Sequence, residues 1–175
     1  MKKVICISAK AQHGKDTTAT ILKCELEEQG NRVLIIHYAD LLKYLCREYF
    51  NWDGAKDEVG RTLLQKVGTD IVRSKNPDYW VDFVIGFLKL FEAEWDYVLI
   101  PDCRFPNEVE RMKSAFDAIH LRVVRSNFVS PLSIEQQNHP SEIALDNYPV
   151  DILIDNDTDV THLGNKIIEI VKSFE

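Results

Sequence analysis

Short apolar runs alternate along this chain with longer helix-forming segments, and this alternation constrains the fold more than any other feature. The patterns predict strands at residues 4–7, 33–37, 97–101, 119–124 and 152–154. They predict helices at residues 17–29, 41–50, 58–74, 77–94, 106–116 and 160–174. Apolar strands that alternate with helices are typical of an α/β fold, in which a parallel sheet is covered on both faces and its strand ends gather ligand-binding loops.

Residues at the helix ends refine these assignments. Gly30 is typical of the position just past a helix end. Asp40 is expected to cap the helix at 41–50, and Asn76 to cap the helix at 77–94, with Pro77 in its first turn. The polar stretch 126–147 lacks the composition of a linker, so we expect a mobile loop within a single domain that spans residues 1–175.

Composition and charge narrow the classes of function. With 175 residues, 45% of them hydrophobic, the chain can bury the core of one globular domain. The formal net charge of −7 argues against a nucleic-acid polymer as the main partner, because phosphate neutralisation needs a surplus of Lys and Arg. Small anionic ligands need only a local cluster of cations, so they fit this charge.

The cysteines and the N-terminus indicate a compartment. Cys6, Cys24, Cys46 and Cys103 show no C-x-x-C spacing, which predicts neither a zinc site nor a disulfide framework. Mostly buried, reduced thiols are the expected state, as in cytosolic proteins. The N-terminal segment has only four apolar residues in a row, too few for a signal peptide, and no stretch approaches a membrane span. We therefore expect a cytoplasmic protein without a membrane partner.

The first predicted strand runs into the sequence SAKAQHGKDTT at residues 8–18. A strand, a loop with Gly-Lys and a helix resemble the phosphate-binding pattern G-x-x-x-x-G-K-[ST], whose amides and helix dipole attract phosphate oxygens. Ala9 replaces the first Gly and Asp16 the hydroxyl residue. Asp16 would repel a triphosphate unless Mg²⁺ lay between them, and Thr17 offers a hydroxyl one residue later. By this pattern alone, both a nucleotide site and a plain helix N-terminus stay open.

Charged residues follow other predicted strands. The apolar run that ends in Asp102 has its carboxylate where phosphate-loop enzymes hold magnesium or activate an acceptor, although an Asp that caps the next helix would look the same. Arg104 follows two residues later and can bind two phosphate oxygens at once. Further cations are Arg73, Arg122 and Arg125. Any one of these arginines can equally form a surface ion pair.

Five segments carry motifs in a consistent order over nearly the whole chain: AKAQHGKDTTA, HYADLLK, LLQKVGTDIVRSKNPDYWV, PDCRFPNEVE and HPSEIALD. They resemble the motifs G-K-x-x-S-G-K-D-T, F-A-D-x-L-K, L-Q-x-x-G-T-x-x-x-R with an aromatic-Trp pair, D-x-R-F-x-N-E and H-x-S-E-x-x-L. These are the motifs of the deoxynucleoside monophosphate kinases of bacteriophages and their relatives. In that family Asp after the loop Lys is usual. The chain departs from the pattern at Ala9 and at His13, which stands where Ser is common and would add a pH-dependent charge near phosphate.

The resemblance implies a three-layer P-loop NTPase fold with a five-stranded parallel sheet flanked by helices. It also implies a helical section that binds the nucleoside monophosphate, at about residues 40–95, and a lid at about residues 126–147. The implied reaction transfers the γ-phosphoryl of ATP, with Mg²⁺, to a (deoxy)nucleoside 5′-monophosphate to give the diphosphate. The base, the sugar and the oligomeric state, a homodimer included, stay open.

This hypothesis assigns roles to individual residues. ATP would be bound by Ala11, Gln12, His13, Gly14, Lys15, Asp16, Thr17 and Asn156. The metal would be held by Asp16, Thr17 and Asp102. The acceptor would be bound by Asp40, Lys43, Gln65, Arg73, Trp80, Arg104 and Glu142. Lys15, Asp102, Arg104 and Arg125 would act in catalysis. Arg125 would approach the moving phosphoryl group when the lid closes.

Several of these residues also have plainer structural explanations. Asp40 could cap a helix, and the aromatic pair that contains Trp80 could belong to the core. Gln65 could be a solvated helix residue, Glu142 could form an exposed salt bridge, and Asn156 could occupy a turn.

Two other functions compete with this one. The first keeps the fold but changes the acceptor, as in a dephospho-coenzyme A or phosphomevalonate kinase. The second is a degenerate kinase that binds a nucleotide without catalysis, which the substitution at Ala9 makes conceivable. A panel of acceptors and the variant Lys15→Ala would separate these functions.

Overall fold

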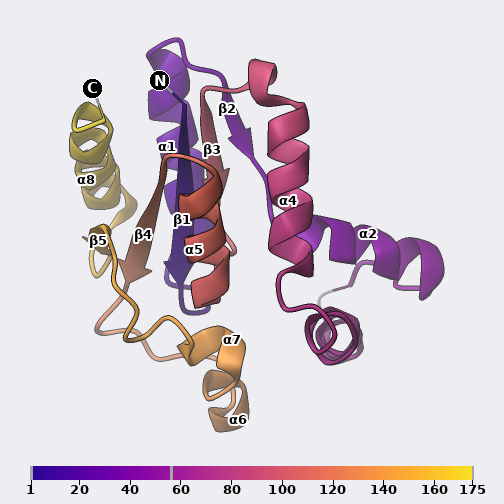
Figure 1. Cartoon of the computed structure of the whole chain (residues 1–175). Helices are drawn as coiled ribbons and strands as arrows, with labels where there is room; N and C mark the ends of the chain where they lie inside the picture. Colours follow the sequence, from indigo (N-terminus) through magenta and orange to yellow (C-terminus); the bar gives the residue numbers. More distant parts are fainter. Residues whose placement is uncertain (1, 56, 175) are drawn as a thin grey trace.

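Within residues 2–55 and 57–174, which the computed structural model describes, five parallel strands form one sheet (Figure 1). They are β1 (Lys3–Ala9), β2 (Val33–Ile35), β3 (Tyr97–Ile100), β4 (Ala118–Val124) and β5 (Ile152–Asp155). Their order across the sheet is β2-β3-β1-β4-β5. The chain leaves the central strand β1 toward one edge and later crosses to the other. The loop after β1 therefore lies at the switch point where α/β sheets bind ligands.

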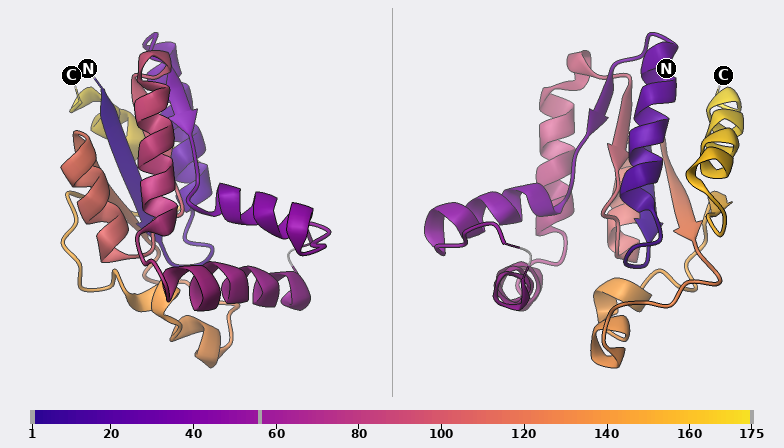
Figure 2. Two further views of the ribbon diagram at one scale, coloured as in Figure 1. Left: turned by 45° about the vertical axis from the view of Figure 1, so that its right-hand side comes forward. Right: turned by 180° about the vertical axis from the view of Figure 1, so that it is seen from behind.

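Helices cover both faces of the sheet, as Figure 2 shows. The helices α1 (Lys15–Glu28) and α8 (Val160–Lys172) pack against the face that carries Ile5 and Ile7. The helices α4 (Tyr79–Leu90) and α5 (Pro106–Ala115) pack against the face that carries Val4 and Cys6. All four of these β1 side chains are buried, because alternate residues of a strand point to opposite faces. The expected three-layer α/β architecture with a parallel sheet is confirmed.

The remaining α-helices and a π-helical segment lie at the carboxyl edge of the sheet. On one side are α2 (Ala39–Tyr49), α3 (Glu58–Gln65) and a π-helical segment η1 (Lys66–Arg73). On the other side are the single-turn helices α6 (Ile134–Gln137) and α7 (Pro140–Ile143) (Figure 1). A short 3₁₀ segment, η2 (Glu92–Glu94), follows α4. In the described parts of the chain, no helix combines the length and the apolar character that a bilayer crossing requires.

The expected cap of the second helix is wrong. The helix α2 begins at Ala39, so Asp40 lies in its first turn, where its carboxylate accepts the backbone N–H of His37 at 2.9 Å. The cap comes instead from Asp102, whose two carboxylate oxygens accept the N–H groups of Tyr38 and Ala39 at 3.0 Å each. Asp102 follows β3, far away in sequence, so the local pattern could not reveal this cap.

The expected start of the fourth helix is also wrong. The helix α4 begins at Tyr79, after a turn in which the side-chain oxygen of Asn76 accepts the N–H of Asp78 at 3.1 Å. Pro77 thus lies within this turn and not in the helix. An Asn side chain that bonds its own backbone two residues on is typical of a turn, which competes with its use as a helix cap.

The third expected helix and the polar stretch near the C-terminus differ from expectation as well. The helix over 58–74 changes at Gln65 into the π-helical segment η1, in which the N–H of Ser74 bonds the carbonyl of Thr69 five residues earlier, at 3.1 Å. The stretch 126–147 is not wholly irregular, because it contains α6 and α7. A capping box, Ser133 with Gln136, opens α6 and was readable in the sequence.

A buried polar contact joins β1 to β4. The ring of His120 is fully buried, with Nε2 2.7 Å from Ser8 Oγ and Nδ1 3.0 Å from the carbonyl oxygen of Pro149. A carbonyl only accepts, so Nδ1 carries the proton and Nε2 accepts the Ser8 hydroxyl. Burial lowers the pKa of His120, which the Pro149 carbonyl partly opposes. The fold therefore contains His120 as a neutral imidazole.

This histidine predicts a loss of stability in mild acid. The unfolded chain binds a proton at His120 near pH 6.5, whereas the folded chain does so only at lower pH. The stability that the neutral His120 ring contributes is therefore fully present above about pH 6.5. It is lost as the pH falls through the lower pKa of the folded state, by at most about 1.4 kcal/mol per pH unit. Urea unfolding of His120→Gln should show lower stability at neutral pH and a shallower pH slope. The variant His162→Gln, on an exposed turn of α8, should keep the wild-type slope.

Candidate active site

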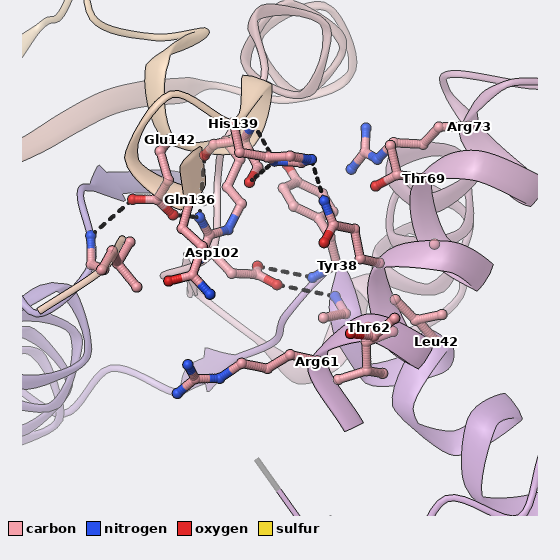
Figure 3. Close-up of a pocket in the computed structure, with 18 of the residues that line it drawn as sticks. Tyr38, Leu42, Arg61, Thr62, Thr69, Arg73, Asp102, Gln136, His139 and Glu142 are labelled. Atoms are coloured by element: carbon pink, nitrogen blue, oxygen red, sulfur yellow. Dashed lines mark hydrogen bonds and ion pairs between the residues drawn. The ribbon is translucent and has the colours of Figure 1, made fainter. Parts of the chain in front are cut away.

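A cavity of about 1040 Å³ opens at the carboxyl edge of the sheet, between α2, α3 and η1 on one side and α6 and α7 on the other. Figure 3 shows side chains from both walls and from the end of β3 pointing into it. The loop after β1 reaches the cavity through Ala11. The lid and the helical section that the sequence predicts thus form the two walls of one hollow.

The loop after β1 is held by the ends of two other strands. The side-chain amide of Asn156, after β5, donates to the carbonyl of His13 at 2.9 Å. The backbone N–H of Arg125, after β4, donates to His13 Nδ1 at 3.0 Å. Gly14 has a φ of 100°, and a Cβ there would lie 2.5 Å from the Asn156 amide nitrogen. Glycine is therefore required at position 14 both by its backbone conformation and by this close approach.

His13 is a neutral hydrogen-bond acceptor in this loop. Burial lowers its pKa most, and the charges of Lys10 and Arg125 lower it further. Its ring and that of Phe128 form a T-shaped pair with 5.5 Å between centroids, and the Arg125 guanidinium lies 4.7 Å from the centroid of the same Phe128 ring. His13 and Arg125 thus lie in one cluster at the base of the lid.

The first turn of α1 carries the residues predicted to bind phosphate and metal. Lys15 Nζ lies 2.6 Å from the carboxylate of Asp16, which is exposed, as is Thr17. The residues that the structure describes contain no group of three or more His, Cys, Asp or Glu that could hold a metal alone. Mg²⁺ usually binds one or two protein carboxylates together with substrate phosphates and water, so an exposed Asp16 fits such a metal. Both oxygens of Asp102, by contrast, are already engaged by α2.

Arg73, from η1, is fixed by contacts on two sides. Its guanidinium forms an ion pair with the buried carboxylate of Glu108 and lies 4.4 Å from the ring centroid of Phe105. Glu108 also accepts the backbone N–H groups of Arg104 at 2.7 Å and Phe105 at 3.0 Å. Burial raises the pKa of Glu108, and the charge of Arg73 opposes that rise. One carboxylate therefore positions Arg73 and the backbone of Arg104 together.

Removal of the Glu108 carboxylate should destabilise the fold strongly. In Glu108→Ala the guanidinium of Arg73 loses its buried partner and two backbone N–H groups lose their acceptor. Loss of one member of a buried ion pair costs about 3–5 kcal/mol, which urea unfolding would measure. The variant Glu110→Ala, exposed on the same helix, is the matched control and should stay within about 0.5 kcal/mol of wild type. Equal stability of the two variants would contradict the role given to Glu108.

Arg104, after β3, faces the lid. Its guanidinium lies 2.5 Å from one carboxylate oxygen of Glu142 and donates to the carbonyl of Ser141 at 3.2 Å. The other Glu142 oxygen accepts the backbone N–H of Ala11 at 3.1 Å. The predicted lid segment, 126–147, therefore contacts both the loop after β1 and Arg104 through one side chain.

The other residues predicted for the acceptor site divide into two groups. Gln65 lines the cavity and bonds the lid residue His139. Trp80 lines it too, but is buried in the core and donates its indole N–H to the carbonyl of Gly68 at 3.1 Å. Asp40 and Lys43 do not line the cavity and form an ion pair with 3.5 Å between Nζ and the carboxylate.

Sequence reasoning missed several residues that line the cavity. They include Tyr38, Leu42, Arg61, Thr62, Thr69 and Gln136. Figure 3 shows Arg61 and Gln136 reaching into the hollow from opposite walls. Spacing could have found two of them, because Arg61 and Thr69 lie four residues before and after Gln65, on one side of a helix. The described residues offer the Arg61 guanidinium no ion pair.

Comparison with known proteins identifies the family. The model of the deoxynucleotide monophosphate kinase family matches residues 51–167. The chain belongs to this family. The deoxynucleotide monophosphate kinase of Enterobacteria phage T4 is 32% identical over 114 residues, which are 64% of this chain and 45% of that protein. The chain thus spans less than half the length of this curated relative.

Solved structures confirm the fold. The APS kinase CysC of Mycobacterium tuberculosis, in complex with AMPPNP and APS, matches with a TM-score of 0.53 and 11% identity over 98% of each chain. A sugar kinase from Janibacter sp. HTCC2649 matches with a TM-score of 0.56 and 11% identity, over 98% of this chain and 95% of that one. The chain therefore has the α/β fold of P-loop kinases. The family match begins at residue 51, so the loop after β1 lies outside it.

Proposed function

We propose that this chain transfers the γ-phosphoryl group of ATP to the 5′-phosphate of a deoxynucleoside monophosphate. The observation that carries the proposal is the convergence of three elements on one cavity. These are the loop after β1, the arginines Arg73 and Arg104, and a wall formed by α2, α3 and η1. Phosphoryl transfer requires chiefly positioning and positive charge around the moving group, which such a site supplies.

The donor would bind at the loop after β1. Backbone N–H groups of residues 11–17 and the ammonium of Lys15 would hold its phosphates, at the positive end of the α1 dipole. Lys15 would exchange its contact with Asp16 for the phosphates. Asp16, with Thr17, would then be free to hold Mg²⁺, which supplies positive charge at the transferred group. Asp102 would act mainly by fixing the start of α2. Any contact that it makes with Mg²⁺ would run through a water molecule.

The acceptor would bind in the wide part of the cavity. Arg73 and Arg104 would bind its phosphate, and Arg61 would add a third guanidinium. Gln65 and Gln136 offer amide donors and acceptors that suit the edge of a base. Residues 126–147 would act as the lid that excludes water, with Arg125 at its root. Because the reaction draws on ATP, we place the protein in the cytoplasm.

Turnover tests this proposal directly. A coupled assay of ADP release, with ATP and Mg²⁺, should show activity with at least one of the deoxynucleoside monophosphates. Lys15→Ala should lower kcat by about 10²–10³-fold, the scale of one lost contact to the moving charge. The control Lys23→Ala, at a half-buried residue of the same helix that pairs with Glu27, should retain wild-type turnover. Flat results across all nucleoside monophosphates would refute the acceptor assignment, and full activity of Lys15→Ala would refute the loop assignment.

Arg61 gives a sharper test of the acceptor site. If its guanidinium binds the acceptor, Arg61→Ala should raise the acceptor KM about tenfold or more, the scale of a hydrogen bond to a charged group. The KM for ATP should change little. The matched control is Lys66→Ala, since Lys66 is a nearby cation that does not line the cavity. Equal KM values in wild type and Arg61→Ala would show that Arg61 makes no contact with the acceptor.

A further inference from the structure

Glu142 lies between the phosphate loop and an arginine of the acceptor site. One of its oxygens accepts the backbone N–H of Ala11 at 3.1 Å, and the other lies 2.5 Å from Nη1 of Arg104. Its side chain is only 10% exposed. A single carboxylate thus occupies two donors that follow two neighbouring strands, β1 and β3.

These two donors form a typical oxyanion site. Backbone N–H groups of a loop at the start of a helix bind phosphate oxygens, and a guanidinium binds them with matched geometry. A carboxylate is the side chain that most resembles a phosphate in charge and in its acceptor oxygens. Glu142 therefore fills the position that an anionic ligand would take at Ala11 and Arg104.

The partners of the two acceptor arginines differ in how easily they can leave. Glu108 is fully buried on α5, a helix of the core, and holds Arg73 and two backbone N–H groups. Glu142 lies on the single-turn helix α7, which nearby contacts such as that between His139 and Gln65 hold to the opposite wall. Glu142 lies on a single-turn helix outside the sheet, so its exchange would leave the core intact, whereas exchange of Glu108 would disrupt the core.

We propose that the Ala11 N–H and the Arg104 guanidinium form an oxyanion site for a nucleotide phosphate, which Glu142 occupies until the phosphate displaces it. The identity of the carrier of that phosphate rests on the proposed function, whereas the exchange itself requires only a phosphate. Only molecules whose site is free of Glu142 can bind an anion. The apparent affinity for every anion is therefore the intrinsic affinity multiplied by the fraction of molecules in which the site is free. Inorganic phosphate has no other contacts to offset this competition, whereas a nucleoside monophosphate also contacts the rest of the cavity. The competition lowers both affinities by the same factor, so a nucleoside monophosphate still fills the site at concentrations at which inorganic phosphate no longer does.

The exchange can be measured at the two donors themselves. In ¹⁵N-labelled protein, the Ala11 amide and Arg104 Nε–H signals would be followed by NMR during a titration with inorganic phosphate. Glu142→Gln and Glu142→Ala should bind phosphate at these signals about tenfold more tightly than wild type, the scale of a lost charged competitor. The control is Glu135→Gln, which removes the same charge from the lid. The Glu135 side chain lines the cavity but contacts neither Ala11 nor Arg104.

Two results would overturn the inference. One is a phosphate affinity of both Glu142 variants that equals or falls below that of wild type, which would make Glu142 a support for the site. The other is an equal gain in phosphate affinity in Glu135→Gln. That result would show that the gain comes from the lower negative charge of the lid and not from the position of Glu142. The titration needs no turnover, so a chain inactive with every nucleotide would still give a readable result. Conversely, a flat titration would leave the kinase assignment intact.

Discussion

The buried carboxylate of Glu108 is the interaction on which the rest of the site depends. It is almost wholly removed from water, and such a charge is tolerated only when donors surround it. Those donors are the backbone N–H groups that follow β3 and the guanidinium of Arg73. The cost of burying one charge therefore forces α5, the end of β3 and η1 into a single arrangement. The positions of the Arg73 guanidinium and of the Arg104 backbone follow from that requirement.

A second carboxylate extends this arrangement to the helical wall. Asp102 accepts the N–H groups of Tyr38 and Ala39, at the start of α2, and so fixes the direction in which that helix leaves the sheet. The loop after β1 is held in a similar way, by Asn156 and by the backbone of Arg125. The side chains of Asp102 and Asn156 each satisfy backbone groups of another element, and the backbone N–H of Arg125 is in turn satisfied by the His13 ring. The carboxyl edge of the sheet is thereby built before any ligand binds.

Much of the fold could be predicted from the sequence, whereas the details of the site could not. Apolar runs such as 4–7 and 97–101 identify buried strands because only a covered parallel sheet accommodates them. The caps of α2 and α4 were mispredicted, since Asp102 acts over a long sequence distance and Asn76 bonds its own turn. Motif matching selected Arg73 and Arg104 but gave no sign that Glu108 and Glu142 are their partners. Ion pairs between distant segments leave no local pattern.

The π-helical segment η1 has a consequence for the length of the chain. A π-helical turn holds more residues than an α-helical turn, and short π segments commonly occur at functional sites. Each residue of a regular helix turns the next by about 100°, so loss of one residue within Lys66–Arg73 would rotate everything after it. Arg73 would then point away from Glu108 and Phe105. Substitutions can be absorbed in this segment more readily than deletions, because the number of its residues sets the direction of the guanidinium at its end.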